Sequence, residues 1–291
     1  MHSSFLLAYF KELLCLYRYF RKFSKKLYDN QVVPYLGPGA LFDAKNAATQ
    51  QTIPADSESL ILAMNNGKPM APKLMYEFPR AAMNMELKRG RNFLGQFLTH
   101  LYGETEWTRA ALHEWLAQWK PAYVVDINRD TQLQDSYADE EHTLIVGLAR
   151  ITETHYRFKL YQFDGKEYFE ITQEQVDPTL PILFKPMGTP KPEANYVASD
   201  ADYVDYITEL MGGFAIPDFL KSYRKDKQYL FIGMRLNRDS ERMVMSDIIS
   251  GGAEHKGWFL NKNPTPKEQR FCQKMGLEII DADVEDLLAA I

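Results

Sequence analysis

The sequence of 291 residues contains only two cysteines, Cys15 and Cys272, which lie far apart in the chain. Two thiols cannot build a disulfide framework, and two thiolates cannot fill a four-cysteine zinc site. We therefore expect a protein without zinc in a reducing compartment, which favours a cytoplasmic location.

Clustered positive charge and long apolar runs are also scarce. The formal net charge is −5, and no long basic run is present, so we expect no nucleic-acid partner. The N-terminal apolar stretch is interrupted by Lys11, Glu12 and Arg18, and no small-residue cleavage site follows it. We expect an amphipathic helix over residues 5–29 rather than a signal peptide or a membrane span.

The last third of the chain alternates between short apolar runs and helical patterns. The runs "QYLFIGM", "GWFLN" and "LEIID" predict strands, and the segments "DSERMVMSDII", "TPKEQRFCQKM" and "VEDLLAAI" predict helices. Strands that alternate with helices favour a parallel sheet covered on both faces. The predicted fold class is therefore α/β, with a Rossmann-like, doubly wound, mainly parallel sheet.

The earlier part of the chain adds strands and one helical insertion. The stretches "QVVPYL", "PAYVVDIN", "TLIVGLARI" and "LPILFKPMG" predict strands, and "YRFKLYQFDGKEYFEI" predicts a hairpin. Residues from about 45 to 119 are predicted to form the helical insertion, with a loop or short helices over 45–75. No internal repeat or low-complexity tract is found, and we expect residues 1–291 to form a single domain.

Four strand ends carry the candidate site, because ligands of doubly wound sheets bind beyond the carboxyl ends of the strands. They are "LGPGA" at 36–40, "DINRD" at 126–130, "KPMG" at 185–188 and "IGMRLNRD" at 232–239. Glycines in the first of these would let a pyrophosphate approach backbone N–H groups, although Pro38 supplies none. A plain strand-to-helix turn explains the same glycines equally well.

Polar residues at the second strand end also have two interpretations. Asp130 could accept hydrogen bonds from ribose hydroxyls, and Asn128 could hold an amide or a water molecule. Both are also favoured helix-capping residues before "TQLQDSY", and taken alone the capping interpretation is preferred. Gly233 would let a ligand pass close to the backbone, and Asp239 has the same capping alternative.

Taken in order, these motifs resemble the SIR2-like (sirtuin-related) superfamily, in its bacterial zinc-free branch, over roughly residues 17–288. "VVPYLGPGA" is similar to the opening Gly-Ala-Gly motif and "DINRD" to Thr-Thr-Asn-Tyr-Asp. "ILFKPMG" is similar to Lys-Leu-His-Gly and "IGMRLNRD" to Gly-x-Ser-Leu-x-Asp. The resemblance implies an NAD site without a metal, with Asn128 and Asp130 as catalytic residues. The residues that it implies for cofactor binding are Gly37, Pro38, Gly39, Ala40, Asn128, Asp130, Met187, Gly188, Gly233 and Asp239.

The sequence departs from this family at the position of the general base. Met187 stands where the family has histidine, and a thioether cannot accept a proton at neutral pH. Arg129 replaces the family's aromatic residue. An alternative alignment places Tyr161 at the histidine position and supplies no base either. His142 or His155 is then the candidate substitute.

Three functions follow from these patterns. The first is a protein that binds NAD or ADP-ribose, lacks the catalytic base, and acts as a sensor or interaction protein. The alternative is an NAD glycohydrolase that releases nicotinamide, with bacterial defence as its setting. The third is an interaction protein without nucleotide, which binds a protein partner or a second copy of the chain. A zinc-dependent deacylase is not expected.

Overall fold

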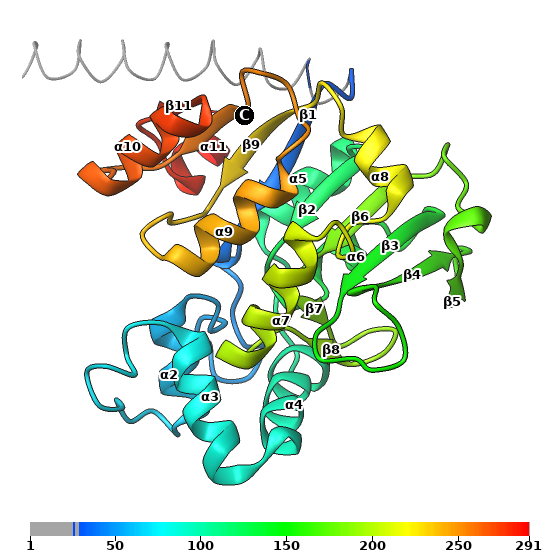
Figure 1. Ribbon diagram of the computed structural model, residues 1–291. Coiled ribbons are helices and arrows are strands. Elements are labelled where there is room, and N and C mark those ends of the chain that lie inside the picture. The colour runs from blue at the N-terminus through cyan, green and yellow to red at the C-terminus, as the bar shows by residue number, and fades with distance from the viewer. Residues whose placement is uncertain (1–25, 27–28, 291) are drawn as a thin grey trace, which may run out of the picture.

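The computed structural model describes Lys26 and residues 29–290, and its main feature is a nine-stranded sheet (Figure 1). The predicted helix over 5–29 lies almost wholly outside the described residues. The strands of the sheet are β1 (Val32–Leu36), β2 (Tyr123–Asp126), β3 (His142–Gly147), β4 (Phe158–Phe163), β5 (Tyr168–Ile171), β6 (Ile182–Lys185), β9 (Gln228–Ile232), β10 (Gly257–Leu260) and β11 (Leu277–Ile280). A separate two-stranded ribbon joins β7 (Gly188–Thr189) to β8 (Asn195–Tyr196).

The strand order is β11-β10-β9-β1-β2-β6-β3-β4-β5. All neighbouring strands from β11 to β3 pair in parallel, and β4 and β5 extend the edge as the predicted antiparallel hairpin. The chain runs from β1 to β2 on one side and later returns to β9 on the other side of β1. The strand order therefore reverses between β1 and β9, which is where a doubly wound sheet opens a crevice.

Ten α-helices lie within the described residues. They are α2 (Ser57–Met64), α3 (Phe78–Arg89), α4 (Arg91–Thr99), α5 (Ala111–Trp119), α6 (Gln132–Ser136), α7 (Asp200–Met211), α8 (Asp218–Tyr223), α9 (Asp239–Ile248), α10 (Pro266–Met275) and α11 (Val284–Ala289). Shorter helical turns are η1 (Pro38–Leu41), η2 (His100–Glu104) and η3 (Gln173–Gln175). No helix in the described part of the chain is both long and apolar enough to cross a membrane.

Helices cover both faces of the sheet, because successive strand residues point to opposite sides. In β1, Val33 and Tyr35 join the apolar cluster formed with α7, α8, α9 and α10. Val32 and Leu36 join the opposite cluster, formed with α5, α6 and α11. This arrangement confirms the predicted Rossmann-like α/β fold.

The helices between β1 and β2 include a group with its own apolar core. α2, α3 and α4 gather near the end of the sheet to which β9 points (Figure 1). Their shared cluster includes Leu41, Leu60, Phe78 and Leu98. This group therefore stands over the strand ends where ligands of such sheets bind.

Candidate functional site

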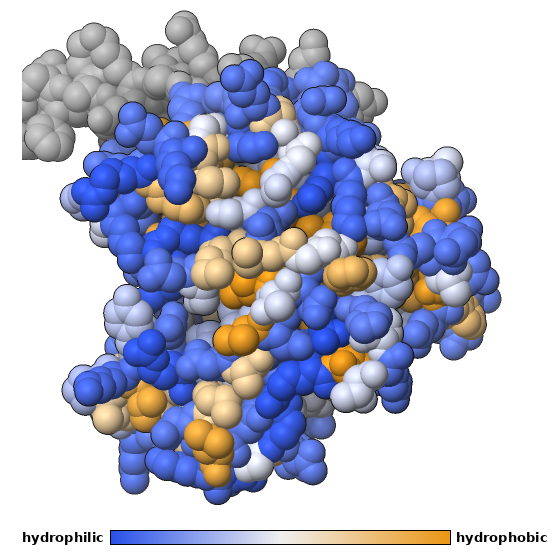
Figure 2. All heavy atoms as spheres, in the orientation of Figure 1, coloured by the Kyte–Doolittle hydropathy of each residue, from blue (hydrophilic) through white to orange (hydrophobic). Residues whose placement is uncertain are grey.

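A cavity of about 670 Å³ lies at the switch point between β1 and β9. Pro38 and Gly39 line it after β1, Gly233 after β9 and Lys262 after β10, while Ser57 lines it from the start of α2. Figure 2 shows the outline of the molecule indented between the part that carries α9 and the part that carries α2. Cavities of roughly 300–1,000 Å³ hold small molecules and cofactors, so this one is large enough for a nucleotide.

The turn after β1 is fixed by its contact with the turn after β9. The N–H of Gly37 donates to the Ile232 carbonyl (2.9 Å), and the N–H of Gly39 donates to the Gly233 carbonyl (2.7 Å). A Cβ on Gly39 would lie 2.8 Å from the Gly233 Cα. The N–H of Ala40 donates to the Gly37 carbonyl (2.9 Å). A strand-to-helix turn that packs against the turn after β9 therefore explains these glycines, and their N–H groups already donate to carbonyls within the protein.

The loop after β9 is held from two neighbouring helices. Glu268 of α10 accepts a hydrogen bond from the N–H of Leu236 (2.9 Å), and Arg242 of α9 donates to the Leu236 carbonyl (2.6 Å). The loop backbone is fixed in this way, and two of the residues that it carries, Arg235 and Arg238, line the large cavity.

Two of the cations in the large cavity already have partners. Lys262 pairs with Asp286 (2.9 Å). Arg235 donates to the Asn261 side chain and to the Lys262 carbonyl (3.3 Å). Their charges are therefore partly used within the protein.

Arg238 differs, because it forms no ion pair with any described residue. Its guanidinium lies 3.7 Å from the centre of the Tyr76 ring. Glu241, in the first turn of α9, lines the same cavity, and its Oε2 has no hydrogen-bond partner in the described chain. Burial raises the pKa of Glu241 to about 7, with Glu77 adding to the shift and Arg238 opposing it. The cavity thus holds an unpaired cation and a carboxyl group that titrates near neutrality.

A second, inner cavity of about 50 Å³ shares lining residues with the large one. Ile127, Arg238 and Glu241 belong to both linings. Asn128 and Met187, which sequence reasoning assigned to the site, line the inner cavity. The structure therefore brings these two predicted residues to one place, at the inner end of the cleft.

Arg129 fills part of this inner end. Its Nε and Nη2 donate to the Val197 carbonyl (3.1 and 2.6 Å), and Nη2 also donates to the Tyr203 hydroxyl (3.4 Å). Its guanidinium lies 5.4 Å from the centre of the Phe78 ring. Only 7% of Arg129 is exposed. A buried cation therefore occupies the position that holds an aromatic residue in the family that the sequence resembles.

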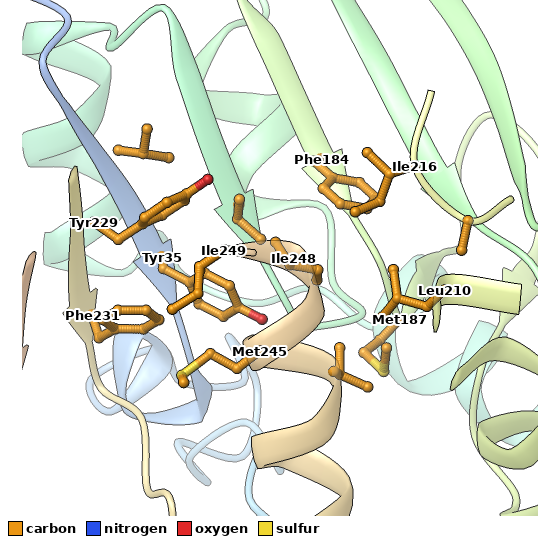
Figure 3. Close-up of a cluster of buried hydrophobic side chains, with 14 of the residues drawn as sticks. Tyr35, Phe184, Met187, Leu210, Ile216, Tyr229, Phe231, Met245, Ile248 and Ile249 are labelled. Carbon is orange, nitrogen blue, oxygen red and sulfur yellow. The ribbon is translucent and has the colours of Figure 1, made fainter. Parts of the chain in front are cut away.

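Met187 belongs to the apolar core as well as to the cavity wall. It is 2% exposed, and Figure 3 shows it among side chains that include Leu210 and Phe184. Its thioether offers no proton acceptor to the cavity. The expected position of the general base is therefore apolar in both residue type and surroundings.

Asn128 connects the ends of β1 and β2. Its Nδ2 donates to the Gly37 carbonyl (2.9 Å) and to Asp126 Oδ1 (2.9 Å). Both hydrogens of the amide are thus used, and only its carbonyl oxygen is left for a ligand.

The other predicted site residues lie outside both cavity linings. Asp130 is 2% exposed and accepts a hydrogen bond from the N–H of Gln132 (2.7 Å), at the start of α6. Asp239 is exposed and pairs with Arg242 of its own helix. Gly188 has φ of +87°, and a Cβ there would lie 2.0 Å from the Asn195 carbonyl oxygen. Ala40 is fully buried. Local structure accounts for Asp239, Gly188 and Ala40 and for one oxygen of Asp130, whose Oδ2 has no hydrogen-bond partner among the described residues.

Neither candidate substitute histidine lines either of the two cavities. His142 lies at the first residue of β3, at the opposite end of the sheet from the site. Its ring nitrogens are 2.8 Å from the Glu140 carbonyl oxygen and 2.7 Å from the Tyr168 hydroxyl, and burial lowers its pKa to about 4. His155 is exposed in the loop between β3 and β4.

A third histidine, His113 of α5, was not singled out from the sequence. It is fully buried, and one donor atom each from His113, Asp126 and Asp130 lie within 4.8 Å of one another. Burial lowers the pKa of His113 to about 3. The Lys185 ammonium lies 2.6 Å from Asp126 Oδ2 and already supplies the positive charge that a metal would bring. The sequence signal that could have identified His113 was its position beside Leu112 on the apolar face of α5.

Comparison with known proteins gives one family. A search among curated proteins found no match. A family model for the SIR2-like domain matches residues 122–280, which is more than half of the chain. The matched range contains the Asn128, Met187 and Gly233 strand ends and leaves out the turn at Gly39. The chain belongs to the SIR2-like domain family.

Proposed function

We propose that this protein binds the ADP portion of NAD or ADP-ribose in the large cavity and does not cleave the nucleotide. It would then act as a sensor or interaction protein, as a divergent member of the zinc-free branch of the family. The observation that carries the proposal is the 670 Å³ cavity at the switch point, with the unpaired Arg238 in its lining.

The diphosphate is assigned to the arginines rather than to the glycine turn. The N–H groups of Gly37, Gly39 and Ala40 donate to backbone carbonyls, so they offer no anion cradle. A guanidinium binds phosphate oxygens through charge-assisted, bidentate hydrogen bonds. Arg238, which lacks a carboxylate partner among the described residues, is therefore the principal phosphate ligand, and Arg235 assists it.

The absence of cleavage is supported by the chemistry of the inner cavity. General-base catalysis needs a proton acceptor within hydrogen-bond reach of the reacting group. Met187 supplies none, and His113, His142 and His155 all lie outside the cavity linings.

Calorimetric titration with ADP-ribose tests the binding proposal. We expect one site per chain, with affinity at least tenfold weaker in Arg238→Gln. Arg270→Gln is the matched control, because Arg270 lies exposed on α10 and lines neither cavity. Equal affinity in Arg238→Gln and Arg270→Gln would refute the assignment of the diphosphate to Arg238.

One observation favours a second function, NAD glycohydrolase. Glu241 lines both cavities, and its raised pKa of about 7 is suited to general-base catalysis near neutral pH. Release of nicotinamide from NAD, measured by chromatography, would support this function if Glu241→Gln abolished it. No release over hours at high protein concentration supports binding without cleavage.

A further inference from the structure

We infer that the site selects nucleotides that end in a neutral ribose, such as ADP-ribose, against NAD⁺, and that Arg129 is the residue that determines this specificity. The inference rests on the proposed function, because it concerns the inner end of the same cleft. On this inference the protein recognises ADP-ribose, a product of NAD cleavage, rather than NAD⁺ itself.

The first argument is space. Beyond the residues shared by the two cavities, the cleft continues only as the inner cavity, whose volume is about 50 Å³. That volume suits a few water molecules and lies far below the roughly 300 Å³ of the smaller ligand pockets. A ribose at the junction can stay within the large cavity. A nicotinamide ring attached to that ribose has to enter the inner cavity, where Arg129 and Met187 already lie.

The second argument is charge. Arg129 is a buried cation that forms no ion pair with any described residue, and Arg238 adds a second positive charge to the same lining. Glu77 and Glu241 are the acidic residues of that lining. Glu77 forms an ion pair with Arg80 (3.6 Å), and the Glu241 carboxyl group is only partly ionised near pH 7. The ring of NAD⁺ is positively charged, so it meets repulsion from Arg129 that a ribose hydroxyl does not.

The third argument is that Arg129 is held in place. Two of its nitrogen atoms donate to the Val197 carbonyl, and this strand end is tied to the site by the hydrogen bond from the Val197 N–H to the Met187 carbonyl (3.1 Å). To admit the ring, the guanidinium would have to leave these bonds while buried. An unpaired buried charge is costly, so we expect the closed arrangement to persist when nucleotide binds.

The experiment compares three nucleotides on the full chain by calorimetric titration at one pH and ionic strength. We expect ADP-ribose to bind at least tenfold more tightly than NAD⁺. NADH is the third ligand, because its ring has nearly the size of the nicotinamide of NAD⁺ but no charge. Weak binding of both NADH and NAD⁺ supports exclusion by size, and tighter binding of NADH than NAD⁺ supports exclusion by charge.

Arg129→Gln tests the residue itself, with Arg270→Gln as the control of equal charge change. We expect the preference for ADP-ribose over NAD⁺ to fall from at least tenfold to less than threefold in Arg129→Gln and to stay unchanged in Arg270→Gln. Thermal unfolding of both variants checks that they are folded. If Arg129→Gln does not fold, the comparison of the three ligands on the unaltered chain still decides whether the site prefers ADP-ribose to NAD⁺.

The two ways of failing are distinct. If no nucleotide binds the unaltered chain, the proposed function is wrong. If ADP-ribose, NADH and NAD⁺ all bind with similar affinity, the nucleotide site stands but the inferred specificity is overturned. A preference that survives unchanged in a folded Arg129→Gln variant removes Arg129 as its cause.

Discussion

The backbone N–H of Gly39 donates a hydrogen bond to the carbonyl oxygen of Gly233 across 2.7 Å, and this bond joins the ends of β1 and β9. It lies at the switch point of the sheet, where other doubly wound proteins leave a crevice for phosphate. Here two backbone segments approach each other closely. The turn after β1 therefore builds the wall of the cavity rather than its anion site.

A methyl group at this contact is expected to destabilise the fold. In Gly39→Ala, the new Cβ would lie 2.8 Å from the Gly233 Cα, so backbone has to shift, at a cost of about 1–3 kcal/mol. Gly95→Ala is the control, because nothing lies within 4 Å of a Cβ there and the position is helical. We expect it to gain up to about 1 kcal/mol. Urea unfolding measures both, and equal stabilities would contradict the assigned contact.

Removal of the buried Asp126 charge is expected to cost far more than removal of an exposed one. Asp126 and Lys185 are both fully buried and lie 2.6 Å apart. Asp126→Asn leaves Lys185 buried without its anion, which costs about 3–5 kcal/mol. In Glu170→Gln the lost partner of Lys159 is exposed, and we expect little change. Denaturant unfolding of the two variants compares them directly, and similar losses would argue against a buried ion pair.

The raised pKa of Glu241 predicts that the difference in stability between the unaltered chain and Glu241→Gln depends on pH. Its folded pKa of about 7 lies above the usual 4.5, so the stability linked to its proton is full below about pH 4.5 and is lost as the pH rises through 7. Its neighbours Arg238 and Arg242 oppose the shift, while Glu77 and Glu268 add to it.

Glu241→Gln removes this dependence. We expect similar stability to the unaltered chain at pH 5 and roughly 1–3 kcal/mol more stability at pH 8. Other titrating groups cancel in the difference between the two proteins. Urea unfolding at the two pH values measures it, and a constant difference would show that Glu241 titrates normally.

Restoring the family's histidine alone is not expected to restore catalysis. Met187→His places an imidazole in an apolar cluster beside Leu210, at a cost of about 1–3 kcal/mol. Arg129 still closes the inner cavity, so nicotinamide release should remain undetectable. Chromatography of NAD incubated with the variant checks this. Turnover in Met187→His would show that the missing base alone prevents cleavage.

Much of the fold was predictable because local patterns determine it. The apolar runs at β1, β2, β6 and β9 are strands, and the Thr-Pro start of α10 is a helix start as expected. The alternation of strands and helices predicted a parallel sheet. Asn128 and Met187, which the strand-end motifs singled out, both line the inner cavity, and their role in binding a nucleotide stays a prediction.

Other features depended on which strands become neighbours, and only the tertiary structure decided them. Because β9 lies beside β1, the Gly39 N–H meets a carbonyl and is lost to a ligand. Because β2 also lies beside β1, one amide hydrogen of Asn128 meets the Gly37 carbonyl and is likewise lost to a ligand. Sequence by itself established the order of strands, helices and strand-end motifs. Hydrogen-bond partners and cavity volume are set by contacts between residues distant in the chain, and no local pattern encodes them.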